Sequence, residues 1–418
     1  MLETGFGVVR GPRNLVFGAG QRMALPQFAK ALGKRALLVT DERMAGEASF
    51  GELVRAVEAT GVSVSIFSGV EAELPAECIA AGVDQGAAFS TDLIVGIGGG
   101  SCLDAAKIIA LLLAHGGDTS DYYGEFKVPG PVLPLIALPT TAGTGSEVTP
   151  VAVVSDKNRA VKVGIASPHL IPHTAICDPE LTYGCPPGLT AVSGADALTH
   201  AIEAFTTARR QPEASTVHDH VFLGKNALSD FYALEAIRLI GGSLAKAVGD
   251  GGDHAARADM MRGATLAGLA FGTAGTAAAH AVQYPVGALT HTAHGLGVAA
   301  MMPYVMEFNL PMARAEMAEI AAALGLPVDG LNQSQRAAAA VDGVAELFAG
   351  IGIPPDIRSL GLAEDKLDWT AEQALAATRL VKNNPRPLDA QSMKRLVQAA
   401  YRGDRASLRN DNFEPEAN

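Results

Sequence analysis

Cysteine is scarce in this chain, and the few cysteines lie far apart. The 418 residues include four, Cys78, Cys102, Cys177 and Cys185, and no two of them form a C-x-x-C pair. This spacing argues against a disulfide framework and against a thiolate zinc site. Such a cysteine pattern is typical of a reducing compartment, so we expect the protein to be cytoplasmic.

A basic excess and long apolar runs are also missing. The chain has 32 Lys and Arg against 44 Asp and Glu, a net charge of −12. A nucleic acid or an anionic membrane would need a basic face, so neither is expected as a partner. No apolar run is long enough to cross a bilayer, and the first residues lack the basic-then-apolar layout of a signal peptide.

What the chain does contain is typical of a compact α/β enzyme. It is 48% hydrophobic, has 46 glycines and is long enough for two domains. β-rich runs at residues 36–40, 62–67, 93–97 and 135–138 alternate with helical patterns at 21–32, 50–60 and 75–88. This order predicts a parallel sheet with helices on both faces. The pattern changes near residue 187 to long helices, so we expect an α/β domain at 1–187 and an all-α domain at 188–418.

The segment GADALTHAIEA at residues 194–204 predicts a buried helix with two polar residues on one face. Asp196 and His200 are four residues apart, which brings both side chains to the same side of a helix. Buried carboxylate and imidazole groups are costly unless they have partners. The spacing alone fits either an ordinary Asp–His hydrogen bond or a shared divalent metal.

Two later histidines could complete a metal site. His280 lies near the end of a small-residue stretch, 263–281, that predicts one tightly packed helix interrupted afterwards by Pro285. His294 lies in THTAHGLG, just before an apolar run. One carboxylate and three imidazoles suit iron(II), zinc, cobalt or nickel. Spacing leaves open whether these segments meet.

Two glycine- and hydroxyl-rich segments follow predicted strands. The segment GIGGGSCLDAAK, residues 96–107, lies where a strand passes into a helix, and its free amides could hold a pyrophosphate. The structural interpretation is a capped helix, with Ser101 as N-cap and Asp104 completing a short-armed capping box, and both interpretations can hold together. Taken by itself, the segment TTAGTGSE, residues 140–147, predicts a flexible turn with a Ser/Thr cap. Asp41 ends another strand, where it could bind a ribose or simply begin the next helix.

Three motifs together resemble the iron-containing (group III) alcohol dehydrogenases, and the resemblance covers nearly the whole chain. In chain order they are the glycine-rich segment 96–107, the segment 140–147, and GADALTHAIEA with the later segments that carry His280 and His294. The resemblance implies a Rossmann-like nucleotide-binding domain followed by a helical domain, as in dehydroquinate synthase. It also implies hydride transfer between an alcohol and NAD, with a metal, iron(II) before zinc, polarising the substrate oxygen. A homodimer or larger homo-oligomer is the expected assembly.

The resemblance assigns roles residue by residue. The metal ligands it implies are Asp196, His200, His280 and His294. The cofactor-binding residues it implies are Asp41, Gly98, Gly99, Gly100, Ser101, Asp104, Thr140, Thr141, Thr144, Ser146 and Lys162. Asp41 is expected to favour NAD over NADP because a carboxylate repels a 2′-phosphate.

The chain departs from the family pattern at several positions. Residues 71–75 read EAELP where Pro-Asn-Pro is common, which puts one cofactor contact in doubt. Tyr284 stands where many members have a histidine near the substrate, and it is the expected proton relay despite the ordinary phenol pKa of about 10. His291 is close to His294, but the glycine that follows His294 matches the motif.

Two alternative functions remain open from the sequence. A hydroxyacid–oxoacid transhydrogenase on the same fold would need a cation for the substrate carboxylate, for which Lys225 in the polar segment 209–225 is the candidate. A nucleotide- and metal-binding protein without turnover is the alternative of a different class.

Overall fold

The computed structural model describes residues 5–159 and 162–409, which form two compact units. Residues 10–185 and 214–221 make an α/β unit, and residues 5–9, 186–213 and 222–409 make a helical unit. The main division, at residues 185/186, falls two residues before the boundary expected from the sequence. One boundary does not describe the division fully. Residues 5–9 precede it but belong to the helical unit, and residues 214–221 follow it but belong to the α/β unit.

Hydrogen bonds account for both segments. Residues 5–9 join the helical unit because the Ala227 amide donates to the Phe6 carbonyl at 3.2 Å and the Val8 amide donates to Asn226 Oδ1 at 3.3 Å. Residues 214–221, with the short helix α7 (Thr216–Asp219), join the α/β unit because Arg10 Nη2 donates to the Val217 carbonyl at 2.6 Å.

The α/β unit is built on a parallel sheet of six strands among the described residues, in the order β1-β9-β6-β4-β2-β3. Its strands are β1 (Asn14–Phe17), β2 (Arg35–Val39), β3 (Ser63–Phe67), β4 (Leu93–Gly98), β6 (Leu135–Pro139) and β9 (Thr174–Cys177). Every pairing in it is parallel. A smaller sheet has the order β5 (Gly124–Glu125), β8 (Val163–Ala166), β7 (Val151–Val154).

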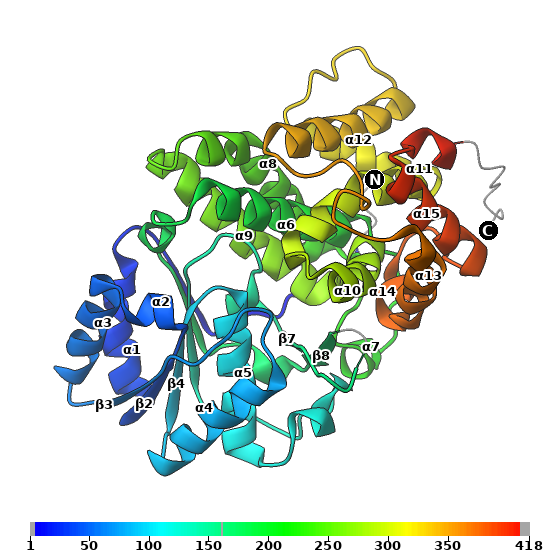
Figure 1. Cartoon of the computed structure of the whole chain (residues 1–418). Coiled ribbons are helices and arrows are strands. Elements are labelled where there is room, and N and C mark those ends of the chain that lie inside the picture. The colour runs from blue at the N-terminus through cyan, green and yellow to red at the C-terminus, as the bar shows by residue number, and fades with distance from the viewer. Residues whose placement is uncertain (1–4, 160–161, 410–418) are drawn as a thin grey trace. The chain divides into compact units, whose positions relative to one another are not determined.

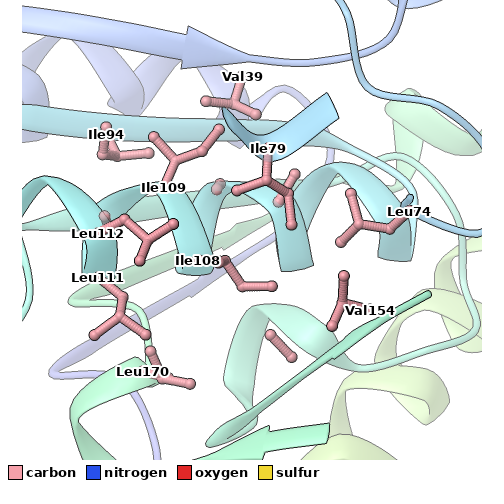
Figure 2. Close-up of a cluster of buried hydrophobic side chains, with 14 of the residues drawn as sticks. Val39, Leu74, Ile79, Ile94, Ile108, Ile109, Leu111, Leu112, Val154 and Leu170 are labelled. Carbon is pink, nitrogen blue, oxygen red and sulfur yellow. The ribbon is translucent and has the colours of Figure 1, made fainter. Parts of the chain in front are cut away.

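Helices cover both faces of this sheet. Successive strand residues point to opposite faces, so neighbouring residues of one strand pack against different helices. Leu37 of β2 belongs to a core cluster with α4 (Ala76–Ala88) and α5 (Gly100–His115), which Figure 2 shows around Ile79, Ile108 and Ile109. Its neighbour Leu38 belongs to a second cluster with α1 (Leu25–Leu32) and α3 (Ala48–Glu58). Figure 1 shows the two helix layers on either side of the strands. The predicted doubly covered parallel sheet is confirmed.

The helical unit has no strand among its described residues. Its helices are α6 (Pro187–Thr206), α8 (Ala227–Gly249), α9 (His254–Ala274), α10 (Ala278–Thr290), α11 (His294–Ala323), α12 (Gln333–Gly350), α13 (Leu367–Ala376), α14 (Thr378–Asn383) and α15 (Ala390–Arg402). The nearly apolar α6 packs against α8, α9 and α11. None of the helices in the described part of the chain is both long and apolar enough to span a bilayer.

The single helix expected at residues 263–281 was wrong. The chain leaves α9 after Ala274, and Gly275 takes a φ of +87°, which a residue with a side chain rarely adopts. α10 then starts at Ala278, and Pro285 lies inside it rather than ending it. Composition did not reveal the break, because alanine is common on both sides of it. The break places His280 in the first turn of a new helix.

Candidate metal centre and nucleotide-binding turn

Asp196 and His200 lie on one face of α6, as their spacing indicates. Both are buried, with 3% and 5% of their surface exposed. His200 Nε2 is 3.8 Å from Asp196 Oδ1. The His200 ring stacks on Phe271 of α9, with 4.3 Å between ring centroids. The helix therefore presents a carboxylate and an imidazole side by side within apolar surroundings.

His280 and His294 reach the same place from the starts of α10 and α11. His280 Nε2 is 4.0 Å from Asp196 Oδ1, and the His280 and His294 ring centroids are 5.3 Å apart. Among the described residues, Asp196, His280 and His294 each offer a ligand atom within 4.8 Å of the other two. His200 is not part of that set, although its ring stacks on His280 at 4.7 Å. The structure thus gathers three of the four residues tightly, with the fourth beside them.

Glu203 is a residue of this centre that the sequence reasoning missed. It is fully buried on α6, and His280 Nδ1 donates to its Oε2 at 2.6 Å. Burial alone would raise the pKa of Glu203, but the nearby His280 and the hydrogen bonds it accepts lower it overall. Asp196, His200 and Glu203 are spaced i, i+4 and i+7, one polar stripe on an otherwise apolar helix. That stripe was a signal available in the sequence.

The hydrogen bond to Glu203 decides which nitrogen of His280 is available. Because Nδ1 carries the donated proton, Nε2 presents its lone pair. This Nε2 atom is buried and has no hydrogen-bond partner among the described residues, which is costly for a polar atom inside a protein. A divalent cation beside Asp196 would remove that cost. The donor set, a carboxylate with imidazoles, therefore fits a metal such as iron(II) or zinc.

Tyr284 lies one helical turn after His280 and borders the same centre. It is half-buried, and its ring centroid is 6.2 Å from that of His294 with the planes 28° apart. His291, by contrast, ends α10 at a φ of +54° and is exposed. His291 thus lies in a turn outside the helices, whereas His294 is the first residue of α11.

The glycine-rich segment forms the turn between β4 and α5. Gly98 has a φ of +152°, and a Cβ on it would lie 2.5 Å from Cys102 Sγ, so a side chain there is excluded. A Cβ on Gly100 would lie 2.6 Å from Thr144 Cγ2. The N-cap of α5 is Gly99 rather than Ser101, which lies in the first turn. The Ser101 cap, which the sequence offered as the structural interpretation, is therefore absent, and the first amides of α5 have no side-chain cap.

Asp104 does not form the capping box that the sequence allowed, because it faces the segment at residues 140–147 instead. Ser146 Oγ donates to its Oδ1 at 2.6 Å, and the Val153 amide of β7 donates to its Oδ2 at 2.9 Å. The Thr140 amide donates to the Gly98 carbonyl at 3.0 Å. Asp104 and Thr140 thus fasten the hydroxyl-rich segment to the glycine-rich turn, next to Thr141 and Thr144.

Asp41 is an N-cap with one oxygen directed elsewhere. Its Oδ1 accepts the Met44 amide of α2 (Glu42–Ala45) at 2.7 Å. Its Oδ2 lies 3.6 Å from Cys102 Sγ. Burial, followed by this carboxylate, raises the pKa of the Cys102 thiol to about 12, so Cys102 stays protonated. The capping role left open by the sequence is present, and it occupies Oδ1.

Two lysines considered from the sequence are already paired. Lys162 forms an ion pair with Glu73. Lys225 is buried; its Nζ donates to the Phe205 carbonyl at 2.6 Å and to Asp230 Oδ1 at 2.8 Å. Lys225 therefore has its charge neutralised inside the helical unit. The structure contradicts its suggested role as an available cation for a substrate carboxylate.

Comparison with known proteins assigns both units to the same protein family. Residues 12–179 match the family model for iron-containing alcohol dehydrogenase, and residues 190–401 match the C-terminal model of the Fe-containing alcohol dehydrogenase family. The long-chain-alcohol dehydrogenase 1 of Geobacillus thermodenitrificans is 35% identical, over 91% of this chain and 92% of that protein.

Solved structures agree with the sequence matches. A 1,3-propanediol oxidoreductase has a TM-score of 0.88 at 32% identity, covering 95% of this chain and 100% of that one. A sulfoacetaldehyde reductase from Bifidobacterium kashiwanohense, solved with NAD+, has a TM-score of 0.80 at 27% identity, covering 94% of this chain and 98% of that one.

Proposed function

The chain belongs to the iron-containing alcohol dehydrogenase family and is a metal-dependent, NAD-linked oxidoreductase. On this basis we propose which residues bind the metal, which bind the cofactor and which transfers the proton. The metal ligands we propose are Asp196, His200, His280 and His294. The observation that supports this set is the approach of Asp196, His280 and His294 ligand atoms to within 4.8 Å of one another. His200 completes it through its position beside Asp196.

The helical unit supplies all four proposed metal ligands and the residues that orient them. A divalent ion held there supplies Lewis-acid polarisation of the alcohol or carbonyl oxygen. Asp196 contributes a negative charge, and Glu203 keeps His280 in the tautomer that offers Nε2. Phe271, stacked on His200, keeps one side of the centre apolar. Iron(II) is the ion we propose, because four protein ligands leave an open position only on a five- or six-coordinate ion.

The α/β unit is proposed to bind the pyrophosphate of NAD at the turn formed by Gly98, Gly99 and Gly100. Uncapped amides at the start of α5 favour an anion there. The segment carrying Thr140, Thr141, Thr144 and Ser146 supplies hydroxyl groups next to the turn, and Asp104 holds it in place. Asp41 is proposed to exclude a 2′-phosphate through Oδ2, which favours NAD.

Tyr284 is proposed to pass the alcohol proton toward solvent. Its half-buried ring beside His294 supports this role, because a relay must reach both the centre and water. Tyr284→Phe keeps the ring and removes the hydroxyl. We expect it to lower kcat with little change in KM, and a wild-type rate in this variant would remove Tyr284 from the mechanism.

The finer properties of the protein are also proposals. The substrate is an alcohol or its aldehyde, a class that includes the compounds for which relatives are named: long-chain alcohols, 1,3-propanediol and sulfoacetaldehyde. The scarcity of cysteine pairs supports a cytoplasmic location. Leu15 and Phe17 of the edge strand β1, with 42% and 39% of their surface exposed, support a homodimer or larger assembly.

The decisive experiment is anaerobic reconstitution of the purified chain with iron(II), followed by NAD and a panel of primary alcohols and diols. We expect NADH absorbance to appear, and to be lost in His280→Ala. Reduction of an added 2-oxoacid without free NADH would instead indicate the transhydrogenase, which has lost its candidate cation Lys225. Binding of metal and NAD without any redox change would contradict turnover altogether.

A further inference from the structure

The break between α9 and α10 is held from two sides by side chains distant in the sequence. Three residues, 275–277, separate the two helices. Gly275 has a φ of +87°, and Ala277 has φ −139° and ψ −135°, so neither is helical. The first amides of α10 lack carbonyl partners within the helix, as at every helix start. Ala277, the N-cap, has no side-chain acceptor to offer them.

Glu203 takes the place of the missing cap. Its Oε2 accepts the Ala277 amide at 2.8 Å, and its Oε1 accepts the Ala279 amide at 2.7 Å. The same Oε2 accepts His280 Nδ1 at 2.6 Å. One buried carboxylate from α6 therefore both caps α10 and selects the tautomer of a proposed metal ligand. A helix with its own Ser or Asp cap would not couple these two tasks.

Asn383 holds the opposite side of the break. Its Nδ2 donates to the carbonyls of Ala274 and Thr276, at 3.0 Å each. A Cβ on Gly275 would lie 2.9 Å from this Nδ2 atom, so the amide can approach only because residue 275 is glycine. Asn383 is itself 2% exposed and ends α14, which packs on α10. The carbonyls of the break are thus bound by Asn383 and its amides by Glu203.

We infer that Glu203 and Asn383 are positioning residues that clamp this break, and that the clamp sets metal affinity by fixing His280 with Nε2 toward Asp196. The inference rests on the proposed metal centre. Neither residue needs to contact substrate. A carboxylate that accepts the outer N–H of a metal-bound histidine raises the basicity of the ring and fixes its orientation, and its loss typically weakens metal binding about 10–100-fold.

The test measures metal affinity directly, without turnover. The metal-free full chain is titrated with cobalt(II) against a chromophoric chelator, and the visible absorbance of bound cobalt reports its geometry. We expect Glu203→Gln to weaken binding about 10–100-fold, because a neutral amide with one acceptor oxygen cannot serve three donors. Asn383→Ala should weaken it less, since the tautomer of His280 is retained while the break loosens.

A matched control comes from Glu307, another buried glutamate of the helical unit. Its carboxylate accepts Arg409 Nε at 2.8 Å and Arg409 Nη2 at 3.1 Å, away from the proposed metal ligands. Glu307→Gln should therefore lower thermal stability without changing cobalt(II) affinity. Equal affinity in Glu203→Gln and wild type, or equal losses in Glu203→Gln and Glu307→Gln, would overturn the clamp.

A second measurement covers the case in which Glu203→Gln does not fold. Nitrogen NMR of the metal-free chain should show His280 protonated at Nδ1 in wild type and a mixture of tautomers in Glu203→Asp, whose shorter arm misses one or more donors. A single Nδ1 tautomer with full cobalt affinity in both Glu203→Asp and Asn383→Ala would also overturn the inference. Wild type that binds cobalt tightly yet never reduces NAD would refute the proposed function and leave the clamp standing.

Discussion

A single glycine in α11 shows how tightly the helix starts around the metal centre are packed. A Cβ on Gly297 would lie 1.7 Å from Oε1 of Gln283, a residue with only 2% of its surface exposed. Gln283 follows His280 by three residues on α10. The amide therefore occupies space that exists only because residue 297 lacks a side chain.

We predict that Gly297→Ala destabilises the wild-type chain and stabilises a Gln283→Ala background. Overpacking costs about 1–3 kcal/mol, whereas Gly→Ala inside a helix gains up to about 1 kcal/mol. Only the gain remains once Gln283 is shortened. Urea unfolding of the four chains measures this reversal of sign, and destabilisation in both backgrounds would show that another contact limits residue 297.

Lys107 is a buried lysine whose pKa is lowered in the folded chain, so its contribution to the free energy of unfolding rises with pH. A lysine whose pKa is raised by a partner would have the opposite effect. Its Nζ donates to the carbonyls of Thr149 at 2.9 Å and Val151 at 2.7 Å. Burial lowers the pKa of Lys107 from 10.5 to about 8, only partly opposed by Asp104 and Glu147. Below that pKa both folded and unfolded chains carry the proton, so the burial cost is complete. Between the two values only the unfolded chain keeps it, and stability therefore rises with pH.

The prediction is a pH-dependent difference between wild type and Lys107→Met. From about pH 7.5 to about pH 9.5, the unfolding free energy of wild type should rise relative to the variant by about 2 kcal/mol. Urea unfolding at both pH values measures it. Comparing the two chains cancels the titration of tyrosines and cysteines that they share. A difference that stays constant or falls would show that Lys107 keeps an ordinary pKa when folded.

At the scale of elements, Asp104 is expected to act by joining α5, the segment 140–147 and β7. Asp104→Ala leaves the Val153 amide without its partner, a loss of about 1–3 kcal/mol, and frees Ser146. We predict a higher KM for NAD in this variant. Asp104→Asn is the matched control, because its amide oxygen can accept the Val153 amide while its NH2 donates to Ser146. An Asn variant as impaired as the Ala variant would indicate instead that the carboxylate charge contacts the cofactor.

The elements also show where sequence patterns were sufficient. β-rich runs that alternate with helical patterns predicted a sheet covered on both faces. The buried apolar strands β2, β4 and β6 agree with this, because burial on each face requires apolar residues at every position. The alanine-rich stretch from 263 to 281 was misread as one helix. Helix propensity is high on both sides of the break, while Glu203 and Asn383, which hold it open, are distant in sequence.

For the whole molecule, we predict that metal and NAD each raise thermal stability independently. The proposed metal ligands lie in the helical unit and the glycine-rich turn in the α/β unit. A ligand at about 100 times its Kd stabilises the folded state by about 2.7 kcal/mol. Asp196→Ala should abolish the rise in Tm with cobalt(II) and keep the rise with NAD. Gly100→Val, which would collide with Thr144, should do the reverse. Loss of both responses in either variant would contradict this separation.

The sequence alone determined the class of the fold and the order of its two parts, because these depend on local periodicity. It also supplied the residues proposed as metal ligands, through the resemblance of its motifs to a known family. Only the tertiary structure decided that His280 lies in the first turn of a new helix, that Glu203 selects its tautomer and that Lys225 is already neutralised. Each of these depends on contacts between segments distant in the sequence, where geometry rather than residue type determines which polar groups meet.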